Sequence, residues 1–320
     1  MSARIILGNC IDKLKEEPAQ SIQTCVTSPP YYGLRDYGNA DQIGLEETPE
    51  QYVDKLVQVF REVKRVLKDD GTLWLNLGDS YAHSLRQSGI EHAGKLAQKS
   101  KGQIKQGFKP LQVGYKEKDL IGIPWMVAFA LRADGWYLRQ DIIWAKPNPM
   151  PESVKDRCTK SHEYIFLLSK SQKYLFNPII EPANYDGRKD EQFKGAAKSY
   201  DGVMPNGQPQ SFAQNGHARW NKDEEGNRIR NKRSVWTVST KPYKGAHFAT
   251  FPPKLIEPCI SAGSRKGDTV LDPFNGSGTT GQVALEHGRN YVGFDLNPEY
   301  IELTHARLSN VQTSMQGAIA

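Results

Sequence analysis

Hydrophobic positions along this chain switch repeatedly between two periods. Short apolar runs at residues 5–7, 22–27 and 72–77 are typical of buried strands. Between the last two runs, apolar side chains recur at helical spacing over 52–67, after Thr48 as the expected helix cap. This alternation of strands and helices favours an α/β fold.

The same alternation returns in the second half of the chain. Helices are expected from Pro124 and over 253–261. Further strands are expected at 136–144, 163–168, 268–272 and 290–295.

Two long polar stretches interrupt this pattern. Residues 85–118 are rich in lysine and poor in apolar periodicity, which predicts a mobile basic loop that orders on phosphates. Residues 181–234 are rich in Gly, Asn, Gln and charge. Irregular stretches of this length are usually functional or disordered, so we expect an inserted region here.

Four residues after the strand at 22–27 carry candidate chemistry. Ser28, Pro29, Pro30 and Tyr31 follow it directly, and two consecutive prolines can neither continue a ladder nor start a mid-helix turn. They stiffen the backbone at the carboxyl edge of a sheet, where α/β proteins bind ligands. A hydroxyl, a carbonyl and an aromatic face there suit a planar ring that carries an amine, although these residues alone fit a packing turn equally well.

A glycine loop follows the strand at 268–272 and precedes a helical pattern. Gly276 and Gly278 allow the backbone to approach a ligand closely. Asp295 ends the next strand about twenty residues later, the spacing at which an acid reaches a ribose hydroxyl. The loop matches neither the dinucleotide fingerprint nor a P-loop. Strand, loop, helix, strand and acid in this order predict a site for a nucleotide-like cofactor.

Together, Ser-Pro-Pro-Tyr and the Asp-Pro-Phe-x-Gly-x-Gly loop resemble the motifs of DNA amino-methyltransferases. That family transfers a methyl group from S-adenosylmethionine to an exocyclic amine of cytosine or adenine. The catalytic motif precedes the cofactor motif, which is similar to the permuted β group. The resemblance covers about residues 3–180 and 236–310.

The resemblance implies a Rossmann-like α/β fold with a mostly parallel seven-stranded sheet that includes an antiparallel strand. It divides the chain into a catalytic half at 1–180, an inserted target-recognition region at 181–235 and a cofactor-binding half at 236–320.

The resemblance also implies roles for individual residues. Ser28 Oγ and the Pro29 carbonyl would accept the amine hydrogens, with Pro30 beside them and Tyr31 stacked on a base that has left the helix. The expected cofactor-binding residues are Asn9, Cys10, His247, Ala249, Thr250, Phe251, Asp272, Phe274, Gly276, Gly278, Thr279, Thr280 and Asp295. The expected DNA-binding residues are Arg35, Lys146, Arg228, Arg230, Lys232 and Arg233. Asn9 departs from the Asp usual in the family, and Phe251 stands where many relatives have Lys.

Ser28 in place of the Asp of many relatives favours methylation of cytosine N4 over adenine N6. Three other functions are weighed against this one. A cytosine C5 methyltransferase would need a cysteine nucleophile, but Cys259 falls inside a helical pattern. Methylation of a protein glutamine is disfavoured by Ser28, since those relatives carry Asn. A catalytically inactive DNA-binding module is disfavoured because both motifs are intact.

Composition agrees with a nucleic-acid enzyme. The net charge of +6 permits a polyanionic partner. Mean hydropathy is −0.62, and no apolar run approaches membrane-spanning length. Four cysteines without a Cys-x-x-Cys pair disfavour a metal or disulfide framework. We therefore expect a cytoplasmic enzyme of a bacterium or a phage host, a monomer or homodimer, with double-stranded DNA and a cognate restriction endonuclease as partners.

Overall fold

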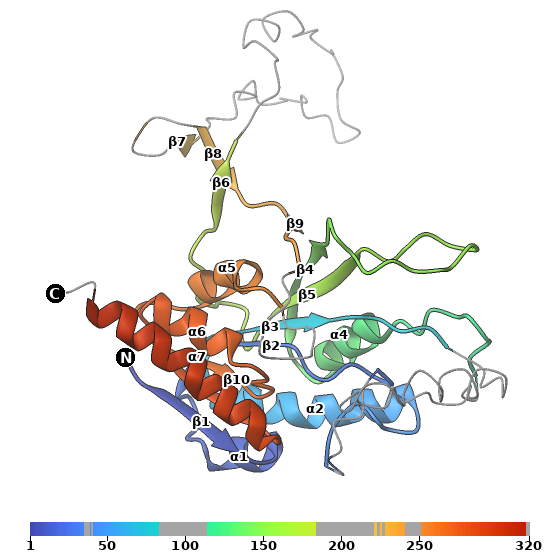
Figure 1. Cartoon of the computed structure of the whole chain (residues 1–320), viewed down its shortest axis with the longest axis horizontal. Helices are drawn as coiled ribbons and strands as arrows, with labels where there is room; N and C mark the ends of the chain where they lie inside the picture. Colours follow the sequence, from blue (N-terminus) through green and yellow to red (C-terminus); the bar gives the residue numbers. More distant parts are fainter. Residues whose placement is uncertain are drawn as a thin grey trace, which may run out of the picture. The chain divides into compact units, whose positions relative to one another are not determined.

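The chain forms two compact units, shown in the computed structural model of Figure 1. One consists of Met1–Asn177 with Ser234–Ala320, and the other of Pro178–Arg233. The structure describes residues 1–34, 39, 41–82, 114–183, 221–222, 225, 228–240 and 251–317. The expected basic loop at 85–118 lies outside these residues except for 114–118.

A sheet of eight strands forms the centre of the larger unit, in the order β1-β11-β10-β2-β3-β5-β4-β9 among the described residues. β5 runs antiparallel to both of its neighbours, and every other neighbouring pair is parallel. The strands are β1 (Ala3–Leu7), β2 (Ile22–Thr27), β3 (Leu67–Leu77), β4 (Tyr137–Ala145), β5 (His162–Ser169), β9 (Val235–Thr237), β10 (Thr269–Asp272) and β11 (Asn290–Asp295).

This arrangement confirms the expected α/β fold with one antiparallel strand, but the expected count of seven strands is wrong. The eighth strand is β9, a segment of three residues that extends the sheet beside β4. Trp236 of β9 lies opposite Trp144 of β4, and both side chains are buried. A segment this short has no periodicity that sequence reasoning can detect.

Helices cover both faces of the sheet. They are α1 (Cys10–Glu16), α2 (Pro49–Val66), α4 (Ile123–Ala133), α5 (Pro253–Gly263), α6 (Thr279–Glu286) and α7 (Pro298–Gly317). α2 packs between α1 and α4, and α6 packs between α5 and α7. Leu73, Leu75 and Leu77 of β3 join the core with the first group, whereas Trp74 meets Gly263 of α5. Successive strand residues face opposite sides, so the two helix groups lie on opposite faces.

Local signals explain how the longest helix of the first group begins. Thr48 accepts a hydrogen bond from the Gln51 backbone N–H, and the Gln51 side chain accepts one from the Thr48 backbone. Pro49 occupies the first turn, where its missing N–H costs nothing. Tyr52, Phe60 and the other apolar positions expected on the buried face are buried. The expected start of this helix is confirmed.

The strand order brings distant parts of the chain to one edge. β10 pairs with β2 and β11 pairs with β1, all in parallel. Their carboxyl ends therefore share one edge of the sheet, where the segments after β1, β2 and β10 and the end of β11 meet. The N-terminal and C-terminal parts of the chain thus build one site together.

The smaller unit, Pro178–Arg233, contains an antiparallel sheet in the order β6-β8-β7 among its described residues. The strands are β6 (Ile180–Pro182), β7 (Asn221–Lys222) and β8 (Arg228–Asn231). The sequence analysis expected an insertion at 181–235, and no strand was predicted inside it. None of the helices that the structure describes is long and apolar enough to cross a membrane.

Candidate active site

A cavity of about 1100 Å³ opens at this edge of the larger unit. Both candidate motifs line it, with Ser28, Pro29, Pro30 and Tyr31 after β2 and the glycine loop after β10. The other expected site residues on its walls are Asn9, Cys10, Lys146, Phe251, Asp272, Phe274, Gly276, Thr279 and Asp295. Gly278 and Thr280 do not line it. Arg35, His247, Ala249 and Thr250 lie outside the described residues.

Asp272 joins the two motifs at the base of the cavity. Its carboxylate accepts hydrogen bonds from Thr27 Oγ1 at 2.6 Å, Thr280 Oγ1 at 2.7 Å and the Phe274 backbone N–H at 3.1 Å. Burial raises the pKa of Asp272 to about 6, although these three donors oppose the shift. Thr280 does not line the cavity itself, but its hydroxyl holds the Asp272 carboxylate, which does.

The glycine loop uses its two glycines differently. Gly276 and Gly278 have φ of +51° and +75°, a left-handed conformation that favours glycine. Gly276 faces the cavity, with space where a Cβ would stand. At Gly278 a Cβ would lie 2.6 Å from the Thr304 side chain. Gly278 therefore allows α6 and α7 to pack closely.

Asp295 holds the loop from the neighbouring strand. Its carboxylate accepts hydrogen bonds from the backbone N–H of Gly276 at 2.7 Å and of Asn297 at 2.9 Å. Burial raises the pKa of Asp295 to about 6. Asn9 stands nearby as the cap of α1, because its side chain accepts a hydrogen bond from the Ile11 N–H at 2.9 Å.

Ser277 is a cavity residue that the sequence analysis did not single out. Its hydroxyl is buried and has no hydrogen-bond partner among the residues that the structure describes. A buried hydroxyl without a partner costs free energy. A polar group of a bound ligand would satisfy it.

The backbone of the proline pair is held rigidly. Tyr52 of α2 donates a hydrogen bond to the Pro30 carbonyl at 2.8 Å. Tyr31 packs directly on Gly78, where a Cβ would lie 2.5 Å from the ring. The Pro29 carbonyl accepts no hydrogen bond from the described residues, and Pro29 lines the cavity. This carbonyl is available as an acceptor for a ligand.

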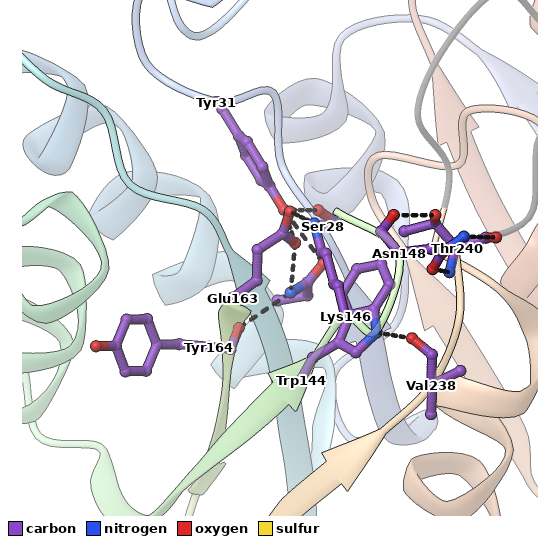
Figure 2. A network of polar contacts seen from close by, with 10 residues as sticks. Ser28, Tyr31, Trp144, Lys146, Asn148, Glu163, Tyr164, Val238 and Thr240 are labelled. Carbon is purple, nitrogen blue, oxygen red and sulfur yellow. Dashed lines mark hydrogen bonds and ion pairs between the residues drawn. The ribbon is translucent and has the colours of Figure 1, made fainter. Parts of the chain in front are cut away.

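A polar network surrounds the Tyr31 hydroxyl, as Figure 2 shows. Tyr31 Oη lies 2.7 Å from Glu163 Oε2, 3.2 Å from Asn76 Oδ1 and 3.5 Å from Ser28 Oγ. Lys146 forms an ion pair with the other Glu163 oxygen. The sequence analysis missed Glu163 and Asn76, because no local motif marks them.

Lys146 lies within the cavity wall, with 18% of its side chain exposed. Its ammonium stands 4.3 Å from the centre of the Trp144 ring and pairs with Glu163. A role in binding a DNA phosphate, which the sequence predicts for Lys146, does not explain why its ammonium pairs with Glu163 inside the protein. The structure connects Lys146 with Tyr31 through Glu163.

Three of the expected DNA-binding residues surround Glu181 in the smaller unit. Arg230 and Arg233 donate hydrogen bonds to Glu181 at 2.9 Å and 3.1 Å, and Lys232 Nζ lies 4.0 Å from the same carboxylate. Burial alone would raise the pKa of Glu181, but the two arginines outweigh it and lower the pKa. Arg228 lies in β8.

Comparisons with known proteins agree with this geometry. A family model described as DNA methylase (N6/N4) matches residues 22–306. The chain is 46% identical over 310 residues to the type II methyltransferase M.XycI of Xanthomonas campestris pv. cyanopsidis, covering 96% of this chain and 88% of that protein. It is 45% identical over 309 residues to the type II methyltransferase M.SmaI of Serratia marcescens, covering 96% and 91%.

Solved structures show the same fold. The PvuII DNA methyltransferase (cytosine-N4-specific) superposes with a TM-score of 0.59 at 20% identity, covering 96% of this chain and 86% of that one. A putative DNA modification methylase of Thermus thermophilus, complexed with S-adenosyl-L-methionine, has a TM-score of 0.57 at 24% identity, covering 97% and 94%. The chain therefore belongs to the N6/N4 DNA methylase family and is an S-adenosylmethionine-dependent DNA methyltransferase.

Proposed function

We propose that this enzyme transfers a methyl group to the exocyclic N4 amine of cytosine in double-stranded DNA. One observation carries the proposal: Ser28 and Pro29, whose carbonyl accepts no hydrogen bond from the described residues, share one cavity with the glycine loop. Two hydrogen-bond acceptors thus stand within the space where a methyl donor would bind. The side-chain acceptor is a neutral hydroxyl, which favours cytosine N4 over adenine N6.

S-adenosylmethionine is the methyl donor of this family, and the residues present fit it. The Asp295 carboxylate would accept hydrogen bonds from the ribose hydroxyls. The buried Ser277 hydroxyl would find a polar partner, and Gly276 would let the backbone approach. Asp272, Phe274, Thr279 and Phe251 would complete this end of the cavity, with Asn9 and Cys10 near the adenine. When bound, the donor supplies a methyl group on a positively charged sulfur.

The protein's own contribution is to make a poor nucleophile reactive. The lone pair of the exocyclic amine is delocalised into the base ring. Acceptance of its two hydrogens by Ser28 Oγ and the Pro29 carbonyl would localise that lone pair on nitrogen. Once the methyl group has bonded to the nitrogen, one of these hydrogens would leave as a proton to solvent. The rigid Pro-Pro backbone, held by Tyr52, fixes both acceptors, so catalysis is mostly orientation. The base must leave the duplex to reach this depth.

Alternative chemistries fit the geometry less well. A cytosine C5 enzyme needs a cysteine thiolate at the site, but Cys259 is buried within α5 and does not line the cavity. Cys10 does line the cavity, but burial raises the pKa of its thiol to about 12. Burial raises the pKa of the Cys259 thiol far above its ordinary value, which suppresses the thiolate. Methylation of adenine N6 remains the competing candidate, because the same two acceptors would serve that amine.

We further propose that Pro178–Arg233 is the target-recognition region. Arg230, Lys232 and Arg233 form a basic cluster around Glu181, with Arg228 on β8 two positions before Arg230. Cations of this kind bind phosphates or the edges of guanine. By analogy with relatives named as type II methyltransferases, we place the enzyme in a bacterial cell beside a restriction endonuclease of the same specificity.

Nucleoside analysis tests the proposed function directly. DNA from cells that express the enzyme is digested to nucleosides and analysed by mass spectrometry. We expect N4-methylcytosine from the wild type and none from Ser28→Ala. N6-methyladenine in its place would establish the alternative. DNA without any new methylated base, from an enzyme that binds S-adenosylmethionine, would support the inactive module.

A further inference from the structure

Glu163 is a charged residue at the catalytic end of the cavity for which no motif gives a role. It lies on β5, the antiparallel strand, directly opposite Trp144 of β4. Only 15% of its side chain is exposed, and both carboxylate oxygens are engaged. Figure 2 shows this carboxylate pointing to Tyr31 and to Lys146.

The phenol of Tyr31 has a single proton to donate. Two acceptors compete for it, Glu163 Oε2 at 2.7 Å and Asn76 Oδ1 at 3.2 Å. The carboxylate is both nearer and charged, and hydrogen bonds to charged acceptors are the stronger ones. The proton therefore points to Glu163.

Asn76 supports this direction. Its amide nitrogen donates to Glu163 Oε2 at 3.2 Å and to the Tyr164 carbonyl at 3.0 Å. The amide thus helps to hold the carboxylate that receives the Tyr31 proton. Lys146 holds the other oxygen of Glu163, which balances the charge of a largely buried carboxylate.

The direction of the Tyr31 proton determines what Ser28 can do. With its proton directed to Glu163, Tyr31 Oη presents lone pairs to Ser28 Oγ, which lies 3.5 Å away. Contacts of this length in a catalytic site shorten when substrate binds. Ser28 then donates its own proton to Tyr31 and keeps its lone pairs for the target amine. Burial and the Glu163 charge raise the pKa of Tyr31 well above its ordinary value, so the phenol stays protonated.

We propose that Glu163 is a positioning residue for methyl transfer, which acts through Tyr31 to leave Ser28 as an acceptor for the target amine. Without this carboxylate, the Tyr31 proton would be shared between Asn76 Oδ1 and Ser28 Oγ. When it turned to Ser28, it would compete with the amine for the serine lone pairs. The inference rests on the proposed role of Ser28, and it applies to cytosine and adenine amines alike.

A double-mutant cycle tests the inference. The single-turnover rate of methyl transfer is measured at saturating cofactor and DNA for Glu163→Gln, Tyr31→Phe and the double variant. We expect each single variant to lose about ten- to hundredfold in rate, the range for a hydrogen bond to a charged group. In the Tyr31→Phe background, Glu163→Gln should cost less than about threefold, because its effect passes through the missing hydroxyl.

Binding measurements separate positioning from a structural role. The dissociation constant of S-adenosylmethionine for Glu163→Gln should stay within about twofold of the wild type, since the partners of this carboxylate among the described residues, Tyr31, Asn76 and Lys146, include none of the expected cofactor-binding residues. Glu163→Asp keeps the charge and should recover part of the lost rate. The inference would be overturned if the rate losses of the two single variants simply multiplied in the double variant. Loss of cofactor binding in Glu163→Gln would also overturn it, as would a Glu163→Asp variant that recovers none of the lost rate.

Glu17→Gln is the matched control. Glu17 is also a buried carboxylate, 4% exposed and paired with Arg4, but it does not line the cavity. Its substitution should lower the melting temperature without changing the transfer rate. The nucleoside analysis distinguishes failure of the proposed base from failure of the proposed role of Glu163. A wild type that makes no N4-methylcytosine defeats the proposed base, whereas an active wild type with an additive cycle defeats only the role of Glu163.

Discussion

At the scale of single residues, burial raises the pKa values of the two acids beside the glycine loop. Asp272 and Asp295 both have pKa values raised to about 6, with burial as the largest cause. For each acid the folded pKa lies above the unfolded one, so its ionisation opposes folding as the pH rises through about 6. Hydroxyl and backbone donors partly offset this cost. A ligand that donates hydrogen bonds to the ionised acid would offset more of it.

Cofactor affinity should therefore depend on pH. Ribose hydroxyls would donate to ionised Asp295, so binding should strengthen as the pH rises through about 6. We expect S-adenosylmethionine to bind about tenfold more weakly at pH 5 than at pH 7, because one pH unit below a pKa leaves roughly a tenth of the group ionised. Calorimetry across this range measures the effect. The Asp295→Asn variant should bind S-adenosylmethionine weakly, and its affinity should depend less on pH. A wild-type affinity that does not change with pH would contradict this role of Asp295.

Ser277 gives a second prediction at this scale. Ser277→Ala removes a buried hydroxyl that has no partner among the described residues. The free enzyme should gain up to about 1 kcal/mol of stability, while affinity for S-adenosylmethionine should fall about tenfold. Thermal unfolding with and without cofactor measures both effects. Equal cofactor affinity in the two proteins would remove Ser277 from the cofactor site.

At the scale of elements, the loop between β10 and α6 lines the cavity and also allows two helices to pack closely. The two functions belong to different glycines, which are two residues apart and share the left-handed conformation. Gly276 has open space beside it on the cavity side, whereas Gly278 abuts Thr304 of α7. Both glycines have left-handed backbones, but only Gly278 lacks space for a Cβ, so the same substitution at the two positions is a matched comparison.

Alanine at each glycine should separate these functions. Gly276→Ala should cost about 1 kcal/mol of stability from backbone strain and should weaken cofactor binding. Gly278→Ala carries the same strain and also a contact at 2.6 Å, so it should cost roughly 2–4 kcal/mol in total. Denaturant unfolding and cofactor titration provide the two readouts. Equal stability losses would show that the α6–α7 contact relaxes freely.

Elements also show which parts of the site could be anticipated. The strand at 22–27, the cap at Thr48 and the glycine loop carry strong local signals, and the structure contains each of them. Glu163 and Asn76 carry none, because neither belongs to a recognisable motif within its strand. They meet Tyr31 only through the register of β3, β5 and β4.

At the scale of the whole molecule, the chain carries a net positive charge, and the smaller unit contains a basic cluster around Glu181. The net charge is +6, and three described cations of the smaller unit, Arg230, Lys232 and Arg233, surround one carboxylate, Glu181. Arg233 keeps 71% of its side chain exposed despite this contact. An exposed arginine in a basic cluster is suited to a phosphate contact that depends on salt.

Removing that cation should weaken DNA binding in a manner that reports on phosphate contact. For Arg233→Gln we expect lower affinity for cognate and unrelated duplexes alike. The slope of log affinity against log salt should fall by about one. Anisotropy titrations at several salt concentrations measure this slope. An unchanged slope would exclude a phosphate contact by Arg233, and a loss confined to the cognate duplex would indicate contact with a base.

Short-range patterns were enough to single out the tetrapeptide at 28–31, the glycine loop and most of the strands, because those features depend on neighbours in the chain. The eighth strand, the neighbours of the Tyr31 hydroxyl and the burial that raises two acid pKa values came only from the folded molecule. They arise when strands far apart along the chain pair in one register, as Ile143 with Val235 and Thr24 with Val270 do. The chemistry of the cavity depends on this long-range pairing. A local sequence pattern does not encode it, so only the tertiary structure decides it.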